Sequence, residues 1–109
     1  MEITVFLKTK DGADAKAVYN TETKECIVKK NSVVSSSISN APTFKSVKSI
    51  KKQRDEFVKN NVVIQDAHFK SSSSAGNFVT GRSTDGMHAW KDINGAPLKN
   101  LVSSEKDNN

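Results

Sequence analysis

The chain has 109 residues and a formal net charge of +5, from 17 basic and 12 acidic side chains. This length supports one hydrophobic core, so a multidomain enzyme is excluded. No apolar run approaches the roughly 18–20 residues needed to cross a bilayer, and the one cysteine, Cys26, excludes an internal disulfide. We therefore expect a cytoplasmic domain with no membrane segment.

Strand patterns are frequent along the chain. Val and Ile together outnumber Leu by 17 to 3, and β-branched side chains favour strands. The predicted strands lie at residues 2–8, 15–19, 26–30, 62–70 and 87–91, and the one at 62–70 is either continuous or broken near its middle. Polar loops separate the first three, which predicts an antiparallel start built from hairpins. The last is bracketed by Asp85-Gly86 and Asn94-Gly95, dipeptides that are typical of tight turns.

One long amphipathic helix is predicted between residues 44 and 60. On a helical projection the apolar side chains share one face, and four lysines fall within a sector of about 60° on the opposite face. The apolar set is Phe44, Val47, Ile50, Phe57 and Val58, and the lysine stripe is Lys45, Lys48, Lys52 and Lys59. Arg54 falls on the apolar side, where its methylene groups can cover the edge of the core.

The lysine stripe allows two interpretations. Residues 41–60 hold six basic and two acidic side chains, which is nearly all of the excess charge of the chain. Such a face is either a solvated surface or a surface that contacts phosphates. Because no aromatic side chain is interleaved with the lysines, we do not expect the stripe to stack on bases.

Residues 71–91 concentrate a second group of informative side chains. Ser71 to Gly81 predict a short helix with a serine cap and a glycine stop. Trp90 is the only tryptophan, and we expect it to be buried as the anchor of a thin core. If Arg82, Ser83 and His88 converge on one exposed patch, they form a second recognition surface.

Catalytic and metal-binding patterns are not predicted. His68, His88 and Cys26 do not have the close spacing of a metal site, and Cys26 lies in a strand pattern where a buried thiol is common. The five glycines do not fit a phosphate-binding loop or a dinucleotide motif. We expect no metal, no cofactor and no enzymatic activity.

The predicted elements combine into an α+β fold. An antiparallel sheet, made of the N-terminal hairpins and later strands, packs against the one long amphipathic helix, with a short second helix beside it. Residues 1–102 form a single domain in this scheme. Residues 103–109 contain no apolar side chain, which predicts a disordered tail.

The segment from residue 71 to residue 91 resembles a small bacterial and archaeal family of domains of unknown function. The family pattern is a serine- and alanine-rich helix, then Gly-Arg-Ser-x-Asn-Gly, then Trp-Lys. Here the corresponding residues are 71–75, then Gly81, Arg82, Ser83, Asp85 and Gly86, then Trp90 and Lys91. Asp85 replaces the usual Asn, and Asn31 replaces a Gly of an upstream strand end, yet both tolerate turn conformations. The resemblance covers most of residues 10–101.

Members of this family often form the C-terminal part of GIY-YIG nuclease-family proteins or lie beside restriction-modification components. The resemblance implies an accessory module, because the tripeptides of a GIY-YIG core are absent from this chain and its one tyrosine, Tyr19, lies outside any such context. Two functions remain open. One is DNA binding through the lysine stripe, with Arg82, Ser83 and His88 as a second contact. The other is docking onto a nuclease or restriction-modification subunit through the face around Met87 and Trp90.

Overall fold

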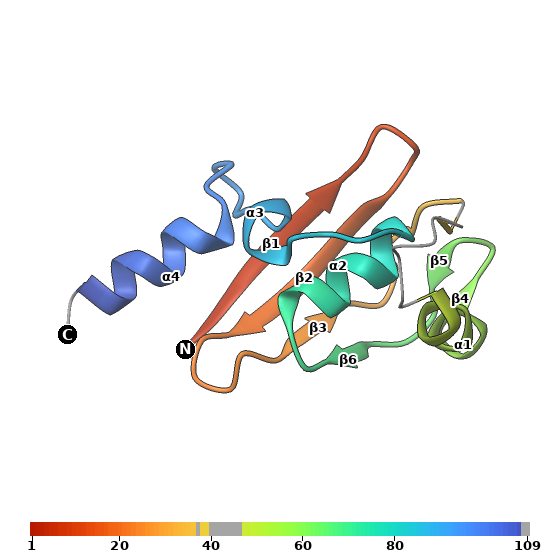
Figure 1. Cartoon of the computed structure of the whole chain (residues 1–109), viewed down its shortest axis with the longest axis horizontal. Coiled ribbons are helices and arrows are strands. Elements are labelled where there is room, and N and C mark those ends of the chain that lie inside the picture. The colour runs from red at the N-terminus through yellow and green to blue at the C-terminus, as the bar shows by residue number, and fades with distance from the viewer. Residues whose placement is uncertain (37, 40–46, 108–109) are drawn as a thin grey trace.

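A four-stranded antiparallel sheet forms the centre of the structure (Figure 1). The computed structural model describes residues 1–36, 38–39 and 47–107, with the backbone alone for 103–107. The strands lie in the order β1-β2-β3-β6 and comprise β1 (Glu2–Lys8), β2 (Asp14–Asn20), β3 (Cys26–Val28) and β6 (Ala67–Phe69). A small second sheet pairs β4 (Val58–Lys59) with β5 (Val62–Val63).

Helices cover one face of this sheet and lie at its two ends. They are α1 (Val47–Phe57), α2 (Ser72–Thr80), α3 (Gly86–Ala89) and α4 (Leu98–Asp107). Helix α2 crosses the sheet, α1 lies near the small second sheet, and α4 extends from the opposite end of the molecule (Figure 1). The predicted α+β class, with an antiparallel sheet and a longest helix near the middle of the chain, is confirmed.

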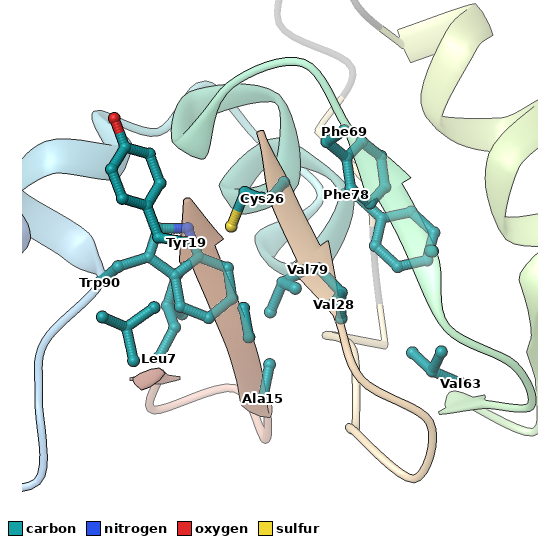
Figure 2. Packing of buried hydrophobic residues seen from close by; sticks show 14 of the residues in the cluster. Leu7, Ala15, Tyr19, Cys26, Val28, Val63, Phe69, Phe78, Val79 and Trp90 are labelled. Carbon is teal, nitrogen blue, oxygen red and sulfur yellow. The ribbon is translucent and has the colours of Figure 1, made fainter. Parts of the chain in front are cut away.

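The core lies between the sheet and α2. Alternation along β1 turns Val5 and Leu7 inward, with exposed fractions of 0% and 4%. Helix α2 contributes Phe78, whose ring packs against that of Phe69 at a centroid distance of 5.0 Å. In Figure 2, Leu7 and Trp90 lie at one side of this cluster and Phe69 and Phe78 at the other. The expected burial of Trp90 is confirmed, because its side chain is 0% exposed.

The ends of α2 follow the sequence prediction. Ser71 is the N-cap, and its hydroxyl oxygen accepts a hydrogen bond from the backbone N–H of Ser74 at 3.1 Å. Gly81 ends the helix in the left-handed conformation, at φ 74°.

The predicted turn at Asp85-Gly86 and the predicted strand at 87–91 are both wrong. Both predictions depended on a dipeptide that can form a turn or begin a helix. Asp85-Gly86 begins a helix instead of a turn, because the Asp85 carboxylate accepts the N–H of Met87 and caps α3. The predicted strand at 87–91 is therefore helical over most of its length, although Lys91 does pair with Phe6 of β1. The Asn94-Gly95 turn is confirmed, with Gly95 at φ 87°.

The predicted long helix ends earlier than Asn60. Asn60 and Asn61 have φ values of 53° and 66° and form the two-residue turn between β4 and β5, as expected of a type I′ hairpin. Lys59 therefore lies in a strand, and not on the helix with Lys48 and Lys52. At the C-terminal end of the chain, α4 reaches Asp107 and so includes the start of the segment, from residue 103, for which the sequence predicts disorder.

Arg54 joins α1 to the C-terminal end of α2. Its guanidinium donates hydrogen bonds to the backbone carbonyls of Phe78 at 3.0 Å, Ser35 at 2.9 Å and Val79 at 3.2 Å, and to the hydroxyl of Ser35. These bonds satisfy helix-end carbonyls that have no partner inside the helix, and a cation is favourable at that end of the helix dipole. Burial lowers the pKa of Arg54, but a guanidinium stays charged at neutral pH. Arg54 is thus a structural link and not merely a cover for the core edge.

We predict that Arg54→Met lowers the free energy of unfolding by about 1–3 kcal/mol, because partly buried carbonyls lose a charged donor. The matched control is Lys52→Met on the exposed side of α1, which should change stability by less than about 0.5 kcal/mol. Urea denaturation measures both variants. Equal midpoints for the two variants would show that Arg54 carries no special role.

Candidate nucleic-acid interface

The loop between α2 and α3 is held by polar side chains of α2 itself. The Asn77 side-chain oxygen accepts the N–H of Thr84 at 2.8 Å, and the Ser73 hydroxyl accepts the N–H of Gly86 at 3.0 Å. The hydroxyls of Thr80 and Thr84 lie 2.6 Å apart. These bonds fix the positions from which Arg82, Ser83 and His88 project.

Helix α3 begins in close contact with the start of α2. A Cβ atom on Gly86 would overlap the backbone of Ser72 and Ser73, so glycine is required there for steric reasons and not for a positive φ. The same approach places the Trp90 indole so that Nε1 donates to the Ser72 carbonyl at 2.9 Å. Because Trp90 is fully buried, the predicted docking face around Met87 and Trp90 is not available at Trp90.

Arg82, Ser83 and His88 do meet at one surface depression, of about 450 Å³. Lys8, from the end of β1, and Lys91, which pairs with β1, also line it. We call Lys8, Arg82, His88 and Lys91 the edge cluster, since they border the edge strand β1. All four side chains are exposed. The depression therefore gathers basic groups from separate parts of the chain.

Two carboxylates moderate the charge of the edge cluster. Oδ2 of Asp11 lies 3.8 Å from the Arg82 guanidinium, and the Thr9 hydroxyl together with Arg82 lowers the pKa of Asp11. Oδ2 of Asp85 lies 2.6 Å from Nδ1 of His88, which lowers the pKa of Asp85. Lys8 and Lys91 have no acidic group within ion-pairing distance in the part of the chain that the structure describes. The two lysines are free to bind an external anion.

A family model described as "Domain of unknown function (DUF4357)" matches residues 5–102. The chain belongs to the DUF4357 family. Comparisons with curated proteins and with solved structures give no match. The match includes the α2–α3 segment and three members of the edge cluster beyond residue 80, as well as Lys8.

The described part of the DUF4357 domain gives no support for a reactive cysteine, a metal site or a membrane-spanning helix. Burial raises the pKa of Cys26 to about 12, so its thiol is protonated and unreactive at neutral pH. Within residues 1–36, 38–39 and 47–102, no group of three His, Cys, Asp or Glu side chains is placed to hold a metal ion. The helices described there are too short or too polar to span a bilayer.

The lysine stripe of the DUF4357 domain is less concentrated than the sequence predicts. Lys48 and Lys52 are exposed on α1, but Asp55 and Glu56 are exposed one turn after Lys52 and reduce its positive potential. Lys59 is exposed on β4, and Lys45 lies outside the described residues.

Lys8 and Lys91 are the members of the edge cluster that sequence reasoning missed as binding residues. In the sequence, Lys8 is the last residue of a predicted strand, and Lys91 belongs to the family pattern together with Gly81 and Trp90. They come together because Phe6 and Lys91 exchange backbone hydrogen bonds of 2.7 and 2.9 Å. No local pattern indicates that pairing.

We predict that Gly86→Ala destabilises the DUF4357 domain by about 3 kcal/mol or more, since backbone atoms must move to admit the new methyl group. Gly76→Ala in α2 is the matched control. There the nearest atom is a Thr84 side-chain carbon at 2.9 Å, so that a side chain and not the backbone must adjust, and alanine is the better helix former; the loss should be smaller than for Gly86→Ala. Thermal unfolding compares the two variants, and equal losses would contradict the close approach of α2 and α3.

Proposed function

We propose that this DUF4357 domain is a non-catalytic module that binds nucleic acid through phosphate contacts. The observation that carries the proposal is the convergence of Lys8, Arg82, His88 and Lys91 on one depression. Arginine and lysine are the side chains that most often contact phosphates, and the Ser83 hydroxyl can add a hydrogen bond. Such contacts give sequence-tolerant binding.

The edge cluster is the contact surface in this proposal, and the exposed lysines of α1 lie outside it. The loop between α2 and α3 is fixed by three polar side chains of α2, so little ordering is needed when a phosphate binds. Lys48 and Lys52 share α1 with two carboxylates. The net charge of +5 steers any polyanion toward the whole domain.

The likeness to domains at the C-terminus of GIY-YIG nuclease-family proteins supports an accessory role. In this proposal the module holds DNA, and a nuclease or restriction-modification subunit carries the chemistry. The alternative, docking onto such a subunit, is favoured by one other observation. Ile93 is 81% exposed at the tip of the turn before α4, and an apolar contact there would not weaken with salt.

We predict that neutralising the edge cluster removes most nucleic-acid binding. The variant Lys8→Gln, Arg82→Gln, Lys91→Gln should lower affinity about tenfold or more at low salt. For duplex DNA, its slope of log K against log salt should be shallower by about 2.7, since three phosphate contacts are lost. Fluorescence polarisation with a labelled duplex measures both quantities.

The matched control is Lys48→Gln, Lys51→Gln, Lys52→Gln on α1, which removes the same amount of charge. It should keep the salt dependence of the parent protein. If the α1 variant is the one that loses binding, the helix face is the interface. If the parent protein binds no DNA even at low salt, the docking alternative replaces this proposal.

A further inference from the structure

The sheet has a second face, opposite to α2, that the core does not use. Strand residues whose side chains point toward the core, such as Val5, Ala17 and Val28, are 0% exposed. The residues between them point to the opposite face of the sheet and are exposed or half-buried. We call this surface the open face. It carries Thr4, Phe6, Lys16, Val18, Ile27 and His68.

Strand register places the aromatic ring of the open face between two lysines. Phe6 lies directly opposite Lys16 on β2, and on its other side it is bridged to Lys91. Side chains at directly opposed positions project from the same face about 5 Å apart. The neighbouring row, two residues along, holds Val18 opposite Ile27. The half-buried Phe6 thus stands between Lys16 and Lys91 in one row across the strands, and the neighbouring row holds aliphatic side chains.

Two depressions meet at Phe6. The larger one, of about 520 Å³, is lined by Phe6, Ala89, Lys91 and Ile93 among others, and the smaller, of about 290 Å³, by Phe6, Lys16 and Lys30. Lys8 and Lys91 line both the larger depression and that of the edge cluster. The open face and the edge cluster are therefore continuous across β1.

The charge of this surface favours a polyanion. Lys8, Lys16, Lys30 and Lys91 line the two depressions, and none of them has an ion-pair partner among the residues that the structure describes. The carboxylates there are Asp14 and Asp92. Asp92 already accepts the backbone N–H groups of Asn94 and Ala96, both at 2.9 Å. The positive charge is in excess and surrounds an apolar centre.

We propose that the open face binds single-stranded nucleic acid, with an unpaired base stacked on Phe6 and the adjoining phosphates on Lys16 and Lys91. Proteins that bind single strands combine a basic path for the backbone with an aromatic side chain for the base. In a duplex both faces of each base are covered by its neighbours, so a duplex can use the lysines but not the ring. This inference rests on the proposed function and specifies its substrate as an unpaired strand.

The test compares Phe6→Leu with the parent protein, using a labelled oligothymidylate and a duplex of equal length. Phe6→Leu should weaken single-strand binding about tenfold or more, because stacking on one base is lost, and should change duplex binding less than about twofold. Phe6→Tyr keeps an aromatic ring and should keep single-strand affinity. Ile93→Ala is the control for a general apolar contact in the same depression, and it should have little effect.

A second variant keeps the test decisive if Phe6→Leu fails to fold. Phe6→Trp adds an indole to the open face, whereas Trp90 is fully buried, so that a bound strand cannot contact it and its emission is a constant background. Oligothymidylate should quench the added fluorescence by stacking, and duplex DNA should not. Absence of quenching, or an equal loss of binding in Ile93→Ala and Phe6→Leu, overturns the stacking proposal.

The outcomes also separate this inference from the proposed function. If the parent protein binds both oligonucleotides and Phe6→Leu changes neither affinity, the stacking proposal fails while phosphate binding stands. If the parent protein binds neither oligonucleotide at low salt, the proposed function fails, and the stacking proposal fails with it.

Discussion

The contact between the start of α2 and the start of α3 is the constraint on which the proposed binding surface depends. Gly86 lets the two helices meet backbone to backbone, and the Trp90 indole then reaches the Ser72 carbonyl. Lys91 directly follows Trp90. The buried indole therefore fixes the backbone at the point where Lys91 lies beside β1. There Lys91 pairs with Phe6, and the preceding loop brings Arg82 to Asp11. A buried packing contact thus determines which cations share one surface.

The opposite end of α2 is restrained in an independent way. Arg54 bonds to the carbonyls of Phe78 and Val79 and ties α1 to the helix end. Helix α2 is therefore held at its first turn by α3 and at its last turn by α1. Because this helix supplies Phe78 and Val79 to a core with few large side chains, loosening either end should affect the whole domain. The proposed binding surface uses side chains at the edge of the sheet and on its open face, which the core does not need.

Local patterns were sufficient for much of the fold but not for the arrangement of the candidate site. Alternation along β1 and the caps of α2 act within a few residues, so the sequence predicts both. Asn60-Asn61 suits either a helix end or a hairpin turn, and Asp85-Gly86 suits either a turn or a helix start, so only tertiary packing decides between them. The grouping of Lys8 with Arg82 depends on the pairing of Phe6 with Lys91, which links distant parts of the chain. The helical projection places Arg54 on the apolar side of α1, but no local pattern indicates its hydrogen bonds to α2.

The central claim is that nucleic acid binds around β1 and not along α1. A titration of isotopically labelled protein with oligothymidylate, followed residue by residue in amide NMR spectra, tests this claim most directly. The account predicts shifts at residues 4–8, at Lys16 and at residues 82–93, with the amides of α1 unchanged. Shifts confined to residues 47–57 would contradict it and return the interface to the lysine-bearing helix.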